Sequence, residues 1–415
     1  MNEVEVWLDD DSLGPSVRVG QLTRNTSKTG DIVRFDYAPE WLQRTAPCAS
    51  FSLDHELPLA DGALYAHAGA DQLSGSFQDC SPDRWGKLLM ERREAIEARE
   101  QKRPLRLLRG WDFLLGVNDE SRMGALRLRD PAGGEYVDAR HLSAPPITAL
   151  RELEAAAGRV ERGDDEQVDK WIRQLIAPGA SLGGARPKAS FRDTDGSLWL
   201  AKFPAMDDRR DVGHWEYITW QLARDAGIDV PPARALKLSG RGHTFAVRRF
   251  DRTSDSRRLY SSAMTRLARS DSDGASYLDI VEVIEREGSS TQIADQLAQL
   301  FRRVLFNILI GNRDDHLRNH GFLRDGNGWV LSPAFDINPN ADKSVHVLGI
   351  DGSDASPDTG LLLATTEFYR LTPRRAKAIE RDVRDVVRGW EPRARTLGLR
   401  KGEIEVMRQV IDAER

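Results

Sequence analysis

The sequence of 415 residues contains no apolar run long enough to cross a membrane, and it has little cysteine. A membrane-spanning helix needs about 20 consecutive, mostly apolar residues. The two cysteines, Cys48 and Cys80, do not stand in a metal-ligand spacing. These absences exclude a transmembrane protein and a disulfide-built scaffold. We expect two buried thiols in a reducing compartment, with a single disulfide as the alternative.

A large excess of charge of one sign is also missing. The 60 basic and 65 acidic residues leave a net charge of −5. Proteins that bind nucleic acid by themselves usually carry a strongly basic domain, so we expect no direct binding of this chain to DNA. Residues 1–7 are acidic and alternate like a strand, whereas a signal peptide begins with basic residues and an apolar core. We therefore expect a cytoplasmic protein with no membrane association.

The length predicts two or three domains or lobes. Residues 1 to about 60 alternate in short strand-like runs. Helical patterns follow at 85–99, behind Pro82 as the expected first helical residue, and at 105–115, 150–161 and 164–176. We place a soft domain boundary between about 110 and 145.

The pattern then changes to strand, strand, helix, strand, strand. The strands are expected at 188–191, 198–203, 233–238 and 244–250, with the helix at 217–226 and a hairpin turn at Asp195-Gly196. From residue 259 onward the pattern is almost entirely helical. This order is typical of the small nucleotide-clasping lobe of a kinase followed by a helical lobe, which makes the predicted class α+β.

Residues 311–319 and 332–337 carry two carboxylates and an amide at the spacing of a phosphotransfer site. Asp314 is the expected base for a substrate hydroxyl, and Asn319 and Asp336 are the expected Mg²⁺ ligands. His316 follows Asp314, whereas in a conventional kinase the histidine precedes the aspartate. The alternative is a polar turn, since turns favour Asp and Asn.

A glycine-rich element precedes the first strand of that small lobe. Glycines let backbone N–H groups approach phosphate oxygens, and the neighbouring basic residues add charge. The alternative is a structural glycine turn. The expected nucleotide-binding residues of this element are Gly183, Gly184, Ala185, Arg186, Pro187 and Lys188.

Two further strands supply candidate residues. Lys202 lies among apolar neighbours and suits a cation that reaches the α- and β-phosphates, with Glu216 as a possible partner. The alternative is an edge lysine with its amine in solvent. Arg248, Arg249 and Phe250 end the last strand, where backbone groups would face an adenine edge; an ordinary strand terminus is the alternative.

With these residues in hand, the chain resembles the HipA family of bacterial toxin kinases over nearly its full length. Residues 181–188 look like the family's glycine-rich loop, 247–252 like its connecting segment, 312–319 like its catalytic loop and 333–337 like its metal segment. Residues 77–86 are similar to the family's N-terminal signature. The resemblance implies an α+β, two-lobed, protein-kinase-like fold with an N-terminal α+β subdomain. That subdomain would take residues 1–110, the small lobe about 145–252 and the helical lobe about 253–415.

The resemblance also implies an activity and partners. The activity would be Mg²⁺- and ATP-dependent phosphorylation of a protein on Ser or Thr, such as an aminoacyl-tRNA synthetase, with autophosphorylation on Ser181. A helix-turn-helix antitoxin, HipB-like, would bind the kinase and link it indirectly to DNA. Asp314 would be the base, Asn319 and Asp336 the metal ligands, and His316 a further nucleotide contact.

Two departures stand out: Arg248 where an acidic residue is common, and Arg318 in place of a lysine. Arg and Lys are not equivalent at a phosphate, so rate or substrate preference could differ. Two alternatives remain open. One is a small-molecule phosphotransferase, and the other is a catalytically silent corepressor acting with the antitoxin.

Overall fold

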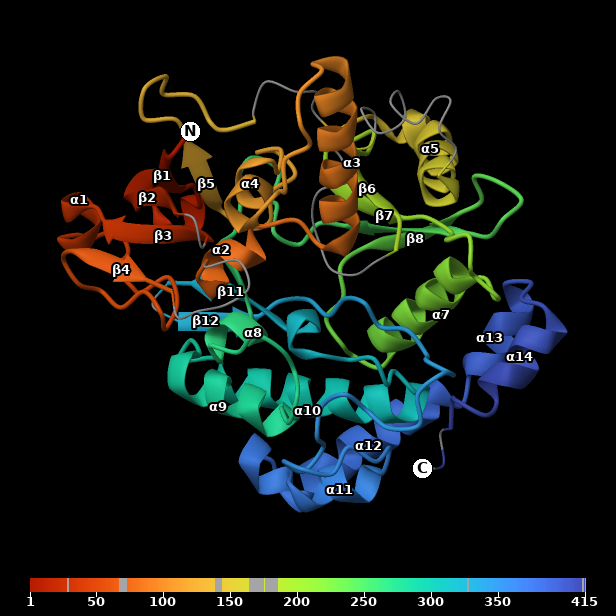
Figure 1. Ribbon diagram of the computed structural model, residues 1–415. Helices are drawn as coiled ribbons and strands as arrows, with labels where there is room; N and C mark the ends of the chain where they lie inside the picture. The colour runs from red at the N-terminus through yellow and green to blue at the C-terminus, as the bar shows by residue number, and fades with distance from the viewer. Residues whose placement is uncertain are drawn as a thin grey trace. The chain divides into compact units, whose positions relative to one another are not determined.

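The computed structural model describes residues 1–27, 30–66, 73–138, 144–163, 175, 186–326, 328–412 and 414. The chain divides into two compact units, and Figure 1 labels their helices and strands. Unit 1 comprises Met1–Asp207 and Arg248–Ser261, and unit 2 comprises Asp208–Val247 and Ser262–Arg415. Neither unit begins or ends within residues 110–145, where the sequence predicts a domain boundary. That boundary stays a prediction.

Unit 1 contains a five-stranded antiparallel sheet with the order β4-β3-β2-β1-β5. Its strands are β1 (Glu3–Leu8), β2 (Val17–Ser27), β3 (Gly30–Tyr37), β4 (Ala63–Tyr65) and β5 (Leu126–Arg129). In β1 the alternate residues Val4, Val6 and Leu8 are buried, because successive side chains of a strand point to opposite faces. The predicted small antiparallel sheet is confirmed, and β5 joins it from well beyond residue 60.

The helices of unit 1 are α1 (Pro39–Leu42), α2 (Gly75–Asp79), α3 (Arg84–Glu100), α4 (Gly110–Leu115) and α5 (Leu150–Arg162). The prediction of Pro82 as the first helical residue was wrong: Asp83 caps α3 by accepting the Gly86 N–H at 2.8 Å. The helix expected from 105 begins only at Gly110, where Asp112 accepts the Arg109 N–H and caps the turn. The expected helix at 164–176 lies almost wholly outside the described residues.

Strands β6 (Lys188–Arg192) and β7 (Leu198–Lys202) of unit 1 form an antiparallel hairpin, as predicted. Its turn includes Gly196 at φ +81°, a left-handed conformation that glycine adopts without steric cost. The cysteines Cys48 and Cys80 are both buried thiols and form no disulfide. Burial raises the pKa of Cys80 to about 12.

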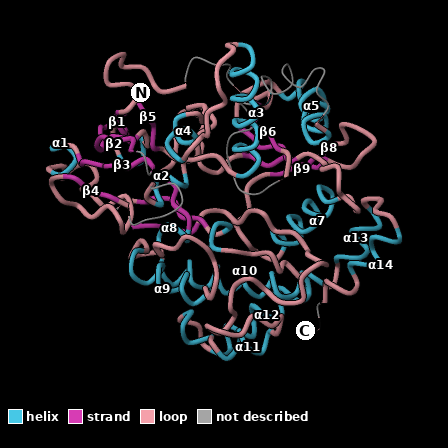
Figure 2. Tube along the Cα trace, viewed as in Figure 1, coloured by secondary structure: helices cyan, strands magenta, loops and turns pink. Residues whose placement is uncertain are grey.

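Unit 2 is mostly helical (Figure 2), as the pattern beyond residue 259 predicts. Its strands β8 (Ala233–Leu236) and β9 (Thr244–Arg248) pair antiparallel, as do β11 (Gly321–Asp325) and β12 (Gly328–Leu331). The short strand β10 spans Tyr260–Ser262. The helices are α7 (Val212–Asp225), α8 (Ala263–Arg266), α9 (Tyr277–Glu287), α10 (Ile293–Ile310), α11 (Thr359–Ala364), α12 (Pro373–Val387), α13 (Trp390–Thr396) and α14 (Lys401–Met407).

Helix α10 forms the core of unit 2. The apolar residues that recur at the helical period along one face are buried: Leu297, Leu300, Val304, Leu305 and Ile308. The last turns of the helix are buried almost all round. A helix that is apolar on every side must be covered on every side, and α9, α11 and α12 pack against it (Figure 1). Residues 311–319 therefore follow directly from a helix that is held in place by packing on several sides. In the part of the chain that the structure describes, no helix is long and apolar enough to span a membrane.

Candidate active site

The loop that carries the predicted catalytic residues begins where α10 ends. Gly311 caps the helix at φ +71°, a left-handed conformation. An added Cβ at this position would lie 2.5 Å from Cγ1 of Val410, so glycine is required both by the backbone and by the space. The N–H of Asn312 then returns to the carbonyl of Asn307 at 2.9 Å. This tight turn sets the direction of the loop that follows.

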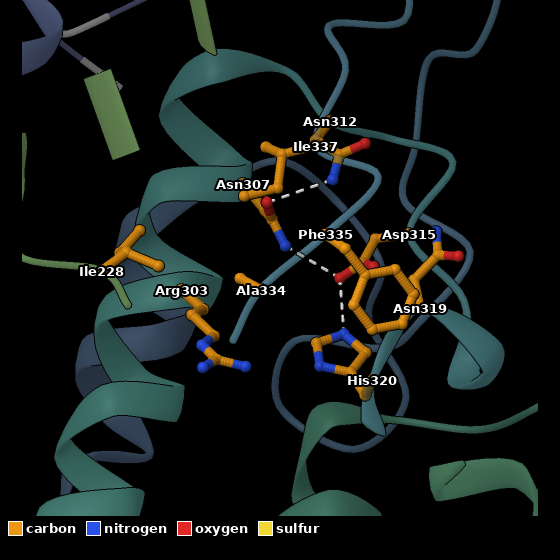
Figure 3. Close-up of a pocket in the computed structure, with 10 residues that line it drawn as sticks. All are labelled: Ile228, Arg303, Asn307, Asn312, Asp315, Asn319, His320, Ala334, Phe335 and Ile337. Carbon is orange, nitrogen blue, oxygen red and sulfur yellow. Dashed lines mark hydrogen bonds and ion pairs between the residues drawn. The ribbon is translucent and has the colours of Figure 1, made fainter. Parts of the chain in front are cut away.

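Asp315, rather than Asp314, is the buried centre of the loop. Its Oδ2 accepts three hydrogen bonds: from Tyr277 Oη at 2.7 Å, from Asn307 Nδ2 at 2.8 Å and from His320 Nε2 at 2.7 Å. Asn312 completes the network, because its Nδ2 donates to Asn307 Oδ1 at 3.1 Å (Figure 3). The network joins α9, α10 and the start of β11 to one carboxylate, which holds the loop in place.

The electrostatics of this network favour an ionised Asp315. Burial alone would raise the pKa of the Asp315 carboxyl. The charge and the hydrogen bond of His320, together with the hydrogen bond from Tyr277, outweigh burial and hold that pKa below its ordinary value. Burial and the nearby Asp315 charge raise the pKa of Tyr277 well above its ordinary value, so the phenol keeps its proton and donates a hydrogen bond to the carboxylate.

A small pocket opens beside this network (Figure 3). The network and the end of α10 form one wall, and Asn319, Phe335 and Ile337 contribute to the lining. Asp336 lies between two of these lining residues and has φ +58°. A non-glycine residue in the left-handed region costs of order 1–3 kcal/mol and is typical of functional sites. The donor types of Asn319 and Asp336, an amide oxygen and a carboxylate, are those that Mg²⁺ prefers.

Asp314 points elsewhere and is accessible, with 57% of its side chain exposed. Its Oδ1 forms an ion pair with Lys343 Nζ. The neighbouring Arg313 donates from Nη1 to the carbonyl of Lys343 at 2.6 Å, and the N–H of Asn340 reaches the carbonyl of Gly311 at 2.9 Å. The segment 340–343 thus lies against the loop that follows α10. His316 of the same loop is half-buried.

Two predicted nucleotide-binding residues of unit 1, Lys188 and Lys202, are buried. Lys188 is only 1% exposed, and its Nζ lies 2.5 Å from Asp83 Oδ2. Trp85 Nε1 donates to the carbonyl of the same lysine at 3.1 Å. The segment 77–86 singled out in the sequence therefore fastens the start of β6. Lys202 stands opposite Lys188 in the hairpin register and is 8% exposed.

The connecting segment is held by charge pairs inside unit 1. Arg249 donates to both carboxylate oxygens of Asp251, at 2.8 and 2.6 Å, and to the carbonyl of Ser121 at 2.6 Å. Burial would raise the pKa of Asp251, but the charges of Arg249 and Arg252 hold it well below its ordinary value. The Arg249 side chain is thus part of the scaffold. Arg248 and Phe250 are half-buried, and the Phe250 ring lies 6.0 Å from that of Tyr260.

The glycine-rich element is described only at its end. Ser181, Gly183, Gly184 and Ala185 lie outside the described residues. Arg186 donates from Nη1 to the carbonyl of Phe203 at 3.2 Å, and the carbonyl of Pro187 accepts the N–H of Phe203 at 2.8 Å. The assignment of these residues to a nucleotide stays a prediction.

Comparison with known proteins decides the family. The sequence matches the profile of the HipA-like C-terminal domain over residues 180–390 and that of the HipA N-terminal domain over residues 4–113. The chain belongs to the HipA family. The two matched ranges include the segment that fastens β6 in unit 1 and the Asp315 network in unit 2.

Relatives of this HipA-family chain include a protein of Sinorhizobium fredii named putative kinase Y4mE. It is 25% identical over an alignment of 352 residues, and the match covers 77% of this chain and 74% of the relative. A second protein of that organism, putative kinase Y4dM, is 29% identical over 157 residues; the match spans 34% of this chain and only 37% of the relative's length.

A solved complex of the Shewanella oneidensis MR-1 toxin–antitoxin proteins HipA and HipB with operator DNA also contains a similar chain. Its TM-score is 0.65 at 17% identity, and the match covers 98% of this chain and 94% of that chain. The likeness shows the fold. The α+β, kinase-like fold that the sequence predicts is confirmed.

Sequence reasoning missed the residues that hold the HipA-family loop in place. Tyr277 lies 38 positions before Asp315, and His320 lies five positions after it. A signal was available at Asn307, a polar residue within the apolar last turns of α10. Buried polar side chains need hydrogen-bond partners, so an amide at this point predicts a polar neighbour close to the helix end.

Proposed function

We propose that this chain is an ATP-dependent serine/threonine protein kinase of the toxin–antitoxin type. The observation that carries the proposal is the arrangement in unit 2. An exposed carboxylate, Asp314, adjoins the buried anchor Asp315. Asn319 follows in the same loop and lines the pocket, and Asp336 lies between two other residues that line it. This order suits a reaction in which the enzyme positions groups and stabilises charge.

In this proposal Asp314 accepts the proton of a substrate hydroxyl as the oxygen attacks the terminal phosphate of ATP. The carboxylate is exposed, so a protein substrate can reach it. Asp315 does not touch the substrate; it orients the loop through its three hydrogen bonds. Asn319 and Asp336 would hold Mg²⁺, which neutralises phosphate charge when bound.

In unit 2 the proposed nucleotide-binding residues are His316, Asn319 and Asp336. Those of unit 1 are Gly183, Gly184, Ala185, Arg186, Pro187, Lys188, Lys202, Arg248, Arg249 and Phe250. Within this set, the Lys188 amine is paired with Asp83, and the Arg249 side chain is buried against Asp251. We infer that these two residues act through their backbone groups and by shaping the strand ends.

We further propose that the substrate is a protein of translation, such as an aminoacyl-tRNA synthetase, that Ser181 is autophosphorylated, and that the protein acts in the cytoplasm. A HipB-like helix-turn-helix antitoxin would be the partner, with DNA reached only through it. Membership of the HipA family supports these assignments, and the formal net charge of −5 agrees with indirect contact to DNA.

One observation favours the alternative of a catalytically silent corepressor. The Asp314 carboxylate is engaged by Lys343, and a base must give up such a partner before it accepts a proton. The pair is solvent-exposed, where ion pairs contribute about 0–1 kcal/mol. A pair this weak is readily displaced by a substrate, so the active kinase remains the function that the geometry supports best.

Transfer of radiolabelled phosphate from ATP to proteins of a cell lysate tests the proposal. Purified wild-type chain is compared with Asp314→Asn, and the labelled band is identified by mass spectrometry. With the wild-type chain we expect one dominant labelled protein. With Asp314→Asn we expect no label on that protein. Equal labelling by both chains would overturn the proposed role of Asp314, and label on small molecules alone would favour the small-molecule phosphotransferase.

A further inference from the structure

A second cluster of ligating side chains lies in unit 2 outside the proposed catalytic loop. Asp211, His214 and His243 each place one possible ligand atom within 4.8 Å of the other two. Asp211 and His214 lie at the start of α7, and His243 immediately precedes β9. We propose that these three residues form a binding site for a divalent transition-metal ion of the Zn²⁺ class.

The two imidazoles converge on the same carboxylate oxygen. His243 Nδ1 lies 2.6 Å and His214 Nδ1 4.0 Å from Asp211 Oδ2. With metal–ligand bonds of about 2.0–2.2 Å, tetrahedral donors stand about 3.3–3.5 Å apart. The two observed distances lie on either side of that value. Binding an ion therefore requires shifts below about 1 Å, one lengthening and one shortening.

The other oxygen of the carboxylate is held by the backbone. Asp211 Oδ1 accepts the N–H of His243 at 2.8 Å and that of His214 at 3.2 Å. This fixes the carboxylate so that Oδ2 faces the two rings. Such second-layer hydrogen bonds orient metal ligands and tune their affinity.

Close approach of the two segments depends on Gly213. A Cβ added there would lie 2.0 Å from the carbonyl oxygen of His243, a distance that no side chain tolerates. Glu403 supports the same corner, because its Oε2 accepts the N–H of Asp211 at 3.1 Å and Trp215 Nε1 at 3.0 Å. The corner is thus built from three separate segments of unit 2.

The two rings lie close enough to each other to share one ion. Their centroids are 4.0 Å apart. The side chains of His243 and Asp211 are 22% and 16% exposed, so an ion and a water in a fourth position have access. Two imidazoles and one carboxylate are a typical ligand set for Zn²⁺.

The alternative is that Asp211 only caps α7 by accepting the His214 N–H and pairs with His243 through a hydrogen bond. The metal site and the simple helix cap predict different effects of an added metal ion. A bound ion would join the start of α7 to the start of β9 through three side chains. It would raise the thermal midpoint of unfolding progressively as the free ion concentration exceeds the Kd.

The test uses full-length, tag-free protein treated with a chelator and then titrated with Zn²⁺ by calorimetry in excess Mg²⁺, which occupies oxygen-only sites. Co²⁺ serves as a spectroscopic probe of ligand number. The variants are His243→Ala, whose side chain is partly exposed, and Asp211→Asn, which keeps a capping oxygen. His55→Ala, an exposed histidine of unit 1, is the matched control.

We expect one Zn²⁺ per chain, a Co²⁺ spectrum of low coordination number, and a rise in thermal midpoint with Zn²⁺. Both variants should bind at least about 10–100-fold more weakly, the loss seen when even supporting groups are removed; His55→Ala should match the wild type. No uptake by the wild type, or an affinity equal to that of the wild type in both His243→Ala and Asp211→Asn, would overturn the site. If a variant does not fold, a wild-type Co²⁺ spectrum typical of six oxygen ligands would overturn it as well.

Discussion

Replacing Asp315 by asparagine should destabilise unit 2 while leaving the shape of the side chain unchanged. The carboxylate oxygen accepts three buried hydrogen bonds, from Tyr277, Asn307 and His320. Bonds to a charged group are worth about 1.5–3 kcal/mol each, and roughly half of that remains when the group is neutral. Allowing for non-additivity, we expect a loss of about 2–3 kcal/mol.

The measurement is the thermal midpoint of unfolding, compared with that of Asp314→Asn. A loss of 1 kcal/mol lowers the midpoint by about 2–4 °C in a domain of 150–250 residues, so Asp315→Asn should lose about 4–12 °C. Asp314 is exposed, and its variant should stay within about 0.5 kcal/mol of wild type. The two variants carry the same chemical change on adjacent residues, so burial is the main difference between them.

The same carboxylate predicts how stability depends on pH. The folded state holds the pKa of Asp315 below its ordinary value, which is about 3.9 in an unfolded chain. Its stabilising contribution is therefore complete above about pH 4 and is lost as the pH falls through the lower folded pKa. The midpoint difference between wild type and Asp315→Asn should be constant from pH 7 to about 5 and shrink below about pH 4. Equal midpoints at pH 7 would refute the anchoring role.

Four further predictions concern the proposed kinase. Asp314→Asn should lower phosphate transfer by about 10²–10⁴-fold without changing the thermal midpoint; a variant that keeps half the wild-type transfer would contradict its role as base. Asn319→Ala and Asp336→Ala should each weaken Mg²⁺-dependent ATP binding in calorimetric titrations, because Mg²⁺ takes few protein ligands; unchanged metal dependence in both would show that the ion is held elsewhere. Lys343→Ala should raise transfer by up to about fivefold, the worth of an exposed ion pair, whereas a fall would place Lys343 on the substrate side. Incubation with MgATP should phosphorylate Ser181 in trans and weaken ATP binding relative to Ser181→Ala, since about −1.5 to −2 charges are added beside the phosphate loop; absence of phosphate at Ser181 would exclude the switch.

Much of the fold follows from local patterns in the sequence. Strand alternation near the N-terminus, the Asp195-Gly196 turn and the apolar period of α10 each depend on neighbours within a few positions. The sequence order of Asp314, Asn319 and Asp336 was readable for the same reason. Helix starts were less reliable: Asp83 and Asp112 cap α3 and α4 at positions that the apolar period does not mark.

Only the tertiary structure separated the two adjacent aspartates. Asp314 and Asp315 have the same side chain, but one is exposed and the other receives donors from α9, α10 and the residue before β11. The same holds for Lys188, which is buried against Asp83 some 105 positions away. Burial and long-range hydrogen bonds arise when distant segments pack together, and no local pattern of residues encodes them.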